Sequence, residues 1–178
     1  MKQNKKGAAV WISAVLYFGL GVILIAIILG ASLPTINKIR DKNIITQTKE
    51  IMHNMDAAVR EVVRQGPGSQ RVMDVQIKKG QFIIDPIQET MTWTYNSKVA
   101  ISEIDETTEI QEGSLKIHTK SGIEEGTYDI QIQLTYTSIA DIQFSNPTQT
   151  IEGLSSLSIK NEGINELTKM PKVGVSEI

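Results

Sequence analysis

The feature that most constrains this chain is an uncharged apolar run near its start. The run extends from Ala8 to Leu33 and reads AAVWISAVLYFGLGVILIAIILGASL. As an α-helix, which rises about 1.5 Å per residue, it would be roughly 39 Å long. The hydrocarbon core of a bilayer is about 30 Å thick and is crossed by about 20 apolar residues. The run therefore predicts a transmembrane helix at residues 8–33.

A run of this kind has a second ordinary interpretation, which is a cleaved secretory signal peptide. Such signals have an apolar stretch of about 7 to 15 residues and a cleavage site of the A-x-A type. The run here is longer, and Gly30-Ala31-Ser32 is a weak match to that site. We therefore expect the apolar helix to remain on the protein as a membrane anchor.

Basic residues flank the run on both sides, so they favour one orientation only slightly. Three precede it and three follow it: Lys2, Lys5, Lys6, Lys38, Arg40 and Lys42. Short segments rich in Lys and Arg tend to stay in the cytoplasm. Because the N-terminal flank is also very short, we expect a single-pass protein of the cell membrane with a cytoplasmic N-terminus. The rest of the chain is then extracytoplasmic.

Small residues interrupt the apolar run at three positions, Gly19, Gly21 and Gly30. Small residues let helix backbones approach closely, which favours helix association in lipid. Glycine is also frequent in membrane helices in general, and the spacing is not G-x-x-x-G. Both interpretations stay open.

Residues 34–65 are predicted to form an amphipathic helix beyond the membrane. Pro34 has no amide hydrogen and is expected to kink or break the helix just after the apolar run. Gly66-Pro67-Gly68 is expected to end it, because glycine and proline are common just past a helix C-terminus. Between these limits apolar residues recur at helical spacing: Ile44, Ile51, Met52, Met55, Ala58, Val59, Val62 and Val63. This stripe is expected to pack on the protein's own domain.

After Gly68 the apolar pattern changes to a period of two, which is typical of strands. The clearest alternation is at residues 128–137, and further strands are predicted at 72–78, 81–85, 90–95, 115–120, 139–144 and 154–160. Several short strands within about 100 residues favour a small antiparallel sheet or sandwich. The fold class is therefore α+β. A long N-terminal transmembrane/amphipathic helix precedes a β-rich domain at residues 69–160 and a loosely ordered tail at residues 161–178.

Composition excludes several classes of function. The net charge of the chain is −2. The only charged residues before residue 35 are three lysines, which contribute +3, so the rest of the chain carries a net charge of −5. A net negative domain does not attract a phosphate backbone, and nucleic acid is therefore not an expected partner. The absence of cysteine excludes disulfides, thiolate zinc sites and a cysteine nucleophile.

Few side chains are suited to catalysis or to metal binding. His118 alternates outward on a predicted strand and His53 lies on the polar helix face, so both are interpreted as solvated. Glu124 and Glu125 are adjacent in a turn, where two carboxylates rarely converge on one substrate. An acidic stretch lacks the calcium-loop pattern and is interpreted as a solvated loop: Asp105, Glu106, Glu109 and Glu112. We predict no enzyme activity, no catalytic residue, no metal site and no cofactor.

The start of the chain carries a recognisable motif, Lys5-Lys6-Gly7-Ala8, followed at once by the apolar helix. It resembles the class III signal peptide of type IV pilins and archaellins, and the archaeal branch more closely. The resemblance implies that a prepilin peptidase cuts between Gly7 and Ala8 and removes residues 1–7 as a leader. The chain departs from bacterial pilins at Ile12, where they usually carry a glutamate that helps to register subunits.

The resemblance also implies a function. The chain would be a structural subunit, major or minor, of a type IV pilus-like surface filament, assembled through its N-terminal helix. Its expected partners are the prepilin peptidase, like or related pilin subunits, an assembly ATPase, a membrane platform protein and the membrane itself. The alternative is a single-pass membrane protein whose extracytoplasmic β domain binds a protein or carbohydrate partner.

Overall fold

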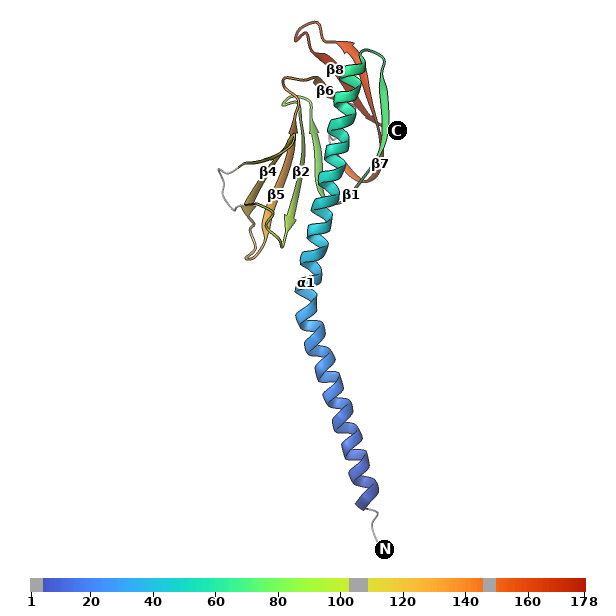
Figure 1. Cartoon of the computed structure of the whole chain (residues 1–178), viewed down its shortest axis with the longest axis vertical. Coiled ribbons are helices and arrows are strands. Elements are labelled where there is room, and N and C mark those ends of the chain that lie inside the picture. Colours follow the sequence, from blue (N-terminus) through green and yellow to red (C-terminus); the bar gives the residue numbers. More distant parts are fainter. Residues whose placement is uncertain (1–4, 103–108, 146–149) are drawn as a thin grey trace. The chain divides into compact units, whose positions relative to one another are not determined.

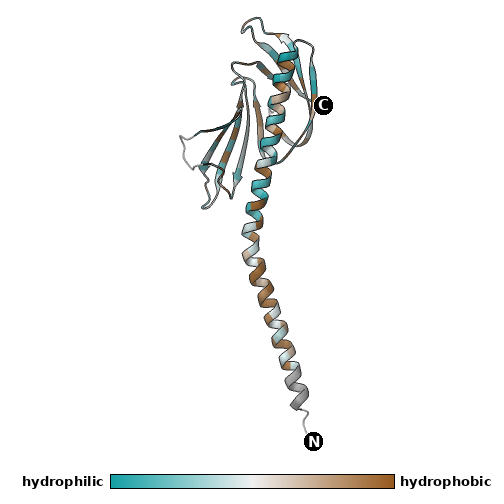
Figure 2. Cartoon of the chain, in the orientation of Figure 1, coloured by the Kyte–Doolittle hydropathy of each residue, from teal (hydrophilic) through white to brown (hydrophobic). Residues whose placement is uncertain are grey.

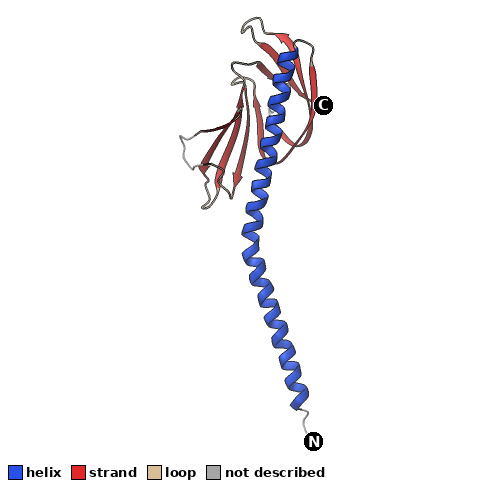
Figure 3. Ribbon diagram, in the orientation of Figure 1, coloured by secondary structure: helices blue, strands red, loops and turns tan. Residues whose placement is uncertain are grey.

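The structure is a computed structural model and describes residues 5–102, 109–145 and 150–178. The chain divides into two compact units, Met1–Arg40 and Asp41–Ile178. One helix, α1 (Lys5–Gln65), supplies the helical residues of both units, and the remaining regular structure is all strand (Figures 1 and 3). The α+β fold class predicted from the sequence is confirmed.

The first unit is helical through Pro34, so the break predicted at this proline does not occur. A proline removes one N–H donor from the helix, here the partner of the Gly30 carbonyl. The turns on either side keep their own hydrogen bonds. The helix therefore loses one hydrogen bond at Pro34 and continues beyond it. The helical segment 8–33 and the segment 34–65 belong to one continuous helix.

The second unit contains the C-terminal part of α1 and one sheet. The strands of the sheet are β1 (Gln70–Asp85), β2 (Thr90–Ser97), β3 (Ile110–Glu112), β4 (Leu115–Ser121), β5 (Tyr128–Thr135), β6 (Asp141–Phe144), β7 (Thr150–Ile164) and β8 (Pro171–Glu177). Their order across the sheet is β3-β4-β5-β2-β1-β7-β8-β6. The helix ends as predicted, because Gly66 and Gly68 both have positive φ, 89° and 86°.

Neighbouring strands are antiparallel except at one edge, where β6 pairs with β8 in parallel. The antiparallel sheet predicted from the sequence is therefore a mixed sheet. A parallel pair needs a crossover connection between its strands. The long strand β7 lies between β6 and β8 in the chain, and it pairs with the other side of β8. This connection places the last strand inside the sheet and β6 at its edge.

The sheet packs on the apolar stripe of α1, and the stripe supplies much of the core. Figure 1 shows the C-terminal part of α1 lying across the sheet, with β2, β4 and β5 on one side of it and β7 on the other. The buried apolar residues of the helix are Ile44, Ile45, Met52, Met55, Val59 and Val62. The largest side chains that the strands bury are Phe82, Ile84, Met91, Trp93, Leu115, Ile130, Ile132 and Leu134. The prediction that the stripe packs on its own domain is confirmed.

The C-terminal residues are ordered in strands, so the prediction of a loosely ordered tail at residues 161–178 is wrong. Strand β7 continues to Ile164, and β8 begins at Pro171. Val173 and Val175 are fully buried in the core. In the sequence of β8 only Val173 and Val175 alternate with other residues, between Pro171 and a polar C-terminal end. So short an alternation is a weak signal for a strand, which is why the sequence does not predict it.

We expect a chain of residues 38–178 to fold in water without detergent. Its buried surface lies within the second unit, which begins at Asp41, and the exposed apolar run lies before it. Circular dichroism should show both helix and strand, and sedimentation should show a monomer. A chain that aggregates, or that shows helix with little strand, would contradict the assignment of the core.

Candidate functional site

The most unusual surface of the chain is the exposed apolar part of α1. Every large apolar side chain between Trp11 and Ile39 is at least 50 % exposed, and Tyr17 and Phe18 reach 76 %. Figure 2 shows hydrophobic residues concentrated along this stretch, with paler residues between them. Burying one such side chain is worth about 1.5 to 3 kcal/mol relative to water. The segment is long and apolar enough to span a membrane, and it needs either lipid or other protein around it.

The three glycines of this segment leave gaps in its apolar surface. A Cβ added at Gly19, Gly21 or Gly30 would meet no atom within 4 Å. Glycine at these positions is therefore not required by contacts within the described chain. The close approach of another helix is one use of such gaps in a membrane.

The residues singled out for processing lie at the very start of α1. The helix begins at Lys5, so Lys6, Gly7 and Ala8 fall within its first turns. The first N–H groups of a helix have no acceptor inside the helix. Unwinding the backbone around Gly7 therefore breaks few hydrogen bonds, and the peptide between Gly7 and Ala8 is at the end of α1 that opens most easily.

A polar contact holds the helix to the end of β2 at Asp41, the first residue of the second unit. Asp41 is only 6 % exposed. Its Oδ1 accepts a hydrogen bond from the Tyr95 hydroxyl at 2.7 Å, and its Oδ2 accepts one from the Lys98 amide at 2.8 Å. Tyr95 in turn stacks on the buried Trp93, with 5.5 Å between ring centroids. We call Asp41, Tyr95 and Lys98 the N-terminal clamp.

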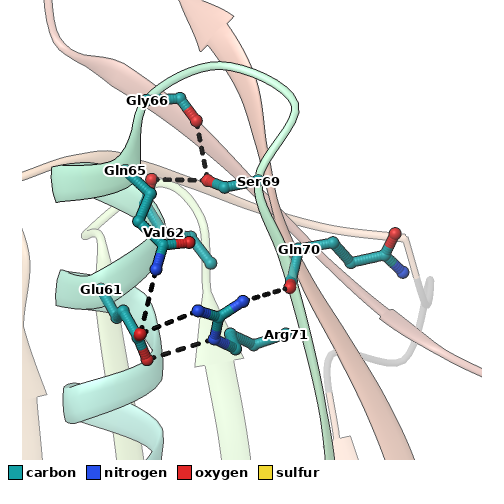
Figure 4. Close-up of polar contacts among 7 residues, drawn as sticks. All are labelled: Glu61, Val62, Gln65, Gly66, Ser69, Gln70 and Arg71. Atoms are coloured by element: carbon teal, nitrogen blue, oxygen red, sulfur yellow. Dashed lines mark hydrogen bonds and ion pairs between the residues drawn. The ribbon is translucent and has the colours of Figure 1, made fainter.

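A second set of contacts holds the other end of the helix. The Val62 carbonyl accepts hydrogen bonds from Ser69 Oγ at 2.8 Å and from Asn161 Nδ2 at 3.0 Å. Arg71 of β1 donates two hydrogen bonds to the Glu61 carboxylate, at 2.8 and 3.1 Å (Figure 4). The pair with Arg71 lowers the pKa of Glu61. These five residues form the C-terminal clamp, which joins the helix to β1 and β7.

Asp56 lies on the helix between the two clamps and is only 7 % exposed. Arg60 donates a hydrogen bond to it at 2.8 Å. Tyr136, from the connection between β5 and β6, lies close to Asp56. Burial, with the nearby Asp56 carboxylate, raises the pKa of the Tyr136 phenol. Helical spacing does not predict the burial of Asp56, because its neighbour Tyr136 is distant in the sequence.

Asp141 and Glu89 form a carboxyl pair in which Asp141 is buried and Glu89 is half-buried. Asp141 at the start of β6 is 6 % exposed and accepts a hydrogen bond from Thr168 Oγ1 at 2.5 Å. Burial raises the pKa of Glu89 in the β1–β2 turn, and the neighbouring Asp141 carboxylate raises it further. Burial alone would raise the pKa of Asp141, but hydrogen bonds from Thr168 and Glu89 outweigh it and lower that pKa.

The other candidate residues that the structure describes lie apart from one another or in ordinary ion pairs. Glu109 pairs with Lys116 at 3.0 Å and lies 3.3 Å from His118, and Glu112 pairs with Lys49. Asp105 and Glu106 lie outside the described residues. His53 and His118 are half-buried, whereas Glu124 and Glu125 are exposed in the β4–β5 turn. Among the described residues, no group of three or more His, Cys, Asp or Glu side chains is placed to hold a metal ion.

Comparisons with protein families, with characterised proteins and with solved structures found no match for this chain. The geometry of the exposed helix and of its two clamps is therefore the basis for assigning a function.

We expect Tyr95→Phe to lower the stability of the β domain by about 1.5 to 3 kcal/mol, because the buried Asp41 carboxylate loses a hydrogen bond. Urea unfolding of residues 38–178 measures the change. Tyr128→Phe is the matched control, since the Tyr128 hydroxyl makes no hydrogen bond within the described part of the chain, and this variant should stay close to the parent chain. Equal unfolding midpoints for both variants would show that the N-terminal clamp does not hold the helix.

Proposed function

We propose that the chain is a pilin-like structural subunit, major or minor, of a type IV pilus-like surface filament. The observation that carries this proposal is the exposed apolar surface of α1 between Trp11 and Ile39, on a helix whose later residues form the core of a folded domain. A subunit of this kind needs an apolar segment that other helices can cover. It also needs a soluble domain that is firmly joined to the same helix.

The mechanism is mechanical rather than chemical. Before assembly, lipid surrounds the apolar helix, and in the filament the same surface packs on the helices of neighbouring subunits. The exchange is feasible because lipid tails and apolar side chains are similar surroundings for such a helix. An assembly ATPase and a membrane platform protein would drive the exchange. The two clamps then transmit force between the helix and the β domain.

Processing by a prepilin peptidase has a physical purpose in this scheme. The leader at residues 1–7 contains every charged residue that precedes Lys38, namely Lys2, Lys5 and Lys6. Positive charge at a helix N-terminus opposes the helix dipole, and charges are costly to bury among apolar helices. Removing the leader on the cytoplasmic side leaves a helix that begins at Ala8, in which the new terminal amine replaces the three lysines as the positive charge before Lys38.

We expect Gly7→Val to leave the precursor uncut in the membrane, because a branched side chain replaces the glycine at the proposed cleavage site. The mass of the membrane-bound chain, isolated from a host with the full assembly machinery, measures this directly. Gly19→Val is the matched control and should be cut normally. Normal processing of the Gly7 variant would contradict the proposed cleavage site.

We expect Leu24→Asp to block filament assembly more strongly than membrane insertion. A charge at the centre of a membrane helix costs about 2.5 to 3.5 kcal/mol on insertion scales, which the rest of the apolar run can absorb. In a helical core the same charge has no route to water and recurs in every subunit. Electron microscopy of surface filaments and fractionation of membranes measure the two effects.

Leu24→Ile, which keeps the position apolar, serves as the control and should form filaments at the parent level. Normal filaments from Leu24→Asp would favour the alternative, a single-pass membrane protein whose β domain binds a separate partner. The absence of filaments from the parent chain, in a host with the assembly machinery, would also favour this alternative.

A further inference from the structure

The sheet has a groove of about 480 Å³ on the face that points away from α1. The groove crosses β4, β5, β2 and β1. Its first row of side chains is set by the register, in which His118 is opposite Gln131, Gln131 opposite Thr94, and Thr94 opposite Gln81. All four line the groove. Residues that alternate with them, such as Trp93 and Ile132, are buried on the helix side of the sheet.

A second row runs beside the first and comes from the same strands. In it Lys120 is opposite Asp129, and Asp129 is opposite Asn96. Asn96 Nδ2 donates a hydrogen bond to Asp129 Oδ1 at 2.6 Å. The lysine and the aspartate balance each other in charge, so the floor of the groove carries little net charge. We call the two rows together the amide groove.

One wall of the amide groove is a bulge in β1 that the core holds in place. The pairing of β1 with β7 shifts register between Ile77 and Phe82. Gly80, within the bulge, has a φ of 84°, and a Cβ there would lie 2.5 Å from Trp93 Nε1. The same Nε1 donates a hydrogen bond to the Lys79 carbonyl at 3.0 Å. The wall is therefore fixed before any ligand arrives, which reduces the entropy cost of binding.

The side chains of the amide groove suit a ligand rich in hydroxyl groups. Three of its side chains are carboxamides, which offer both a hydrogen-bond donor and an acceptor: Gln81, Asn96 and Gln131. Thr94 adds a hydroxyl. A sugar hydroxyl also donates and accepts, so it can satisfy such groups in pairs. Tyr95 and Ile130 also line the groove, but they belong to neither row. Ile130 is only 1 % exposed, and the Tyr95 hydroxyl is bonded to Asp41 of the helix. The two rows themselves carry no large apolar or aromatic side chain that would anchor a peptide or stack on a nucleobase. The balanced charge gives a polyanion no electrostatic advantage.

We propose that the amide groove binds a neutral oligosaccharide segment of a glycan. The inference rests on the proposed placement of the β domain outside the cell, where glycans are displayed, and it gives that domain a ligand. Gln131 is central because it lies in the middle of the first row and has neighbours on both sides. Its carboxamide and the Thr94 hydroxyl are the groups that contact the sugar hydroxyls.

The test uses the full chain in lipid nanodiscs and an array of neutral hexose and N-acetylhexosamine oligosaccharides, with acidic oligosaccharides on the same array. At least one neutral oligosaccharide should bind, and calorimetry then measures its affinity. Gln131→Ala should weaken that binding about tenfold or more, because it removes a hydrogen-bonding partner at the centre of the groove. Thr94→Val, which keeps the side-chain shape and removes only the hydroxyl, should weaken it as well.

Gln133→Ala is the matched control, since Gln133 is the next outward residue of β5 and does not line the groove. It should bind like the parent chain. The proposal is overturned if no neutral oligosaccharide binds, if only acidic ones bind, or if Gln131→Ala binds as well as Gln133→Ala. Filament assembly by the Gln131→Ala variant is scored separately and should be normal, so loss of binding and loss of assembly are distinguishable.

Discussion

Burial of the helix stripe from Ile44 to Val62 against the sheet is the interaction on which the rest of the structure depends. The β domain has no other helix among its described residues, so α1 supplies the second layer that one face of the sheet needs. Met52, Met55 and Val59 are fully buried there. The same helix carries an apolar surface with no cover between Trp11 and Ile39. The helix therefore forms part of a folded core over one part of its length and presents an exposed apolar surface over the other.

The two clamps fix the helix on the sheet at both ends of its buried segment. Apolar burial resists removal of the helix from the sheet but is not directional, so it fixes neither rotation nor sliding. Hydrogen bonds are directional, and they occur at both ends of the buried segment, at Asp41 and at Val62. A pull on the β domain is therefore passed to the helix through two fixed points. This arrangement suits a subunit that is held in a filament by one end.

Several of these features were predictable from the sequence because they depend on local patterns. The apolar run, the stripe from Ile44, the stop at Gly66 and the alternation in β5 all arise from spacing within a few residues. The parallel pairing of β6 with β8 was not predictable, since it depends on partners that local patterns do not specify. Burial of Asp41 and Asp56 depends on Tyr95 and Tyr136, which come from distant parts of the chain. The amide groove needs four strands in register, and each strand alone has an ordinary polar face.

The central claim is that the exposed helix is the packing element of a processed filament subunit. The most direct test is mass spectrometry of filaments sheared from the surface of the native host. The account predicts that this chain is present in the sheared fraction and that its first residue is Ala8. A chain found only in the membrane fraction with Met1 or Lys2 still attached would contradict it.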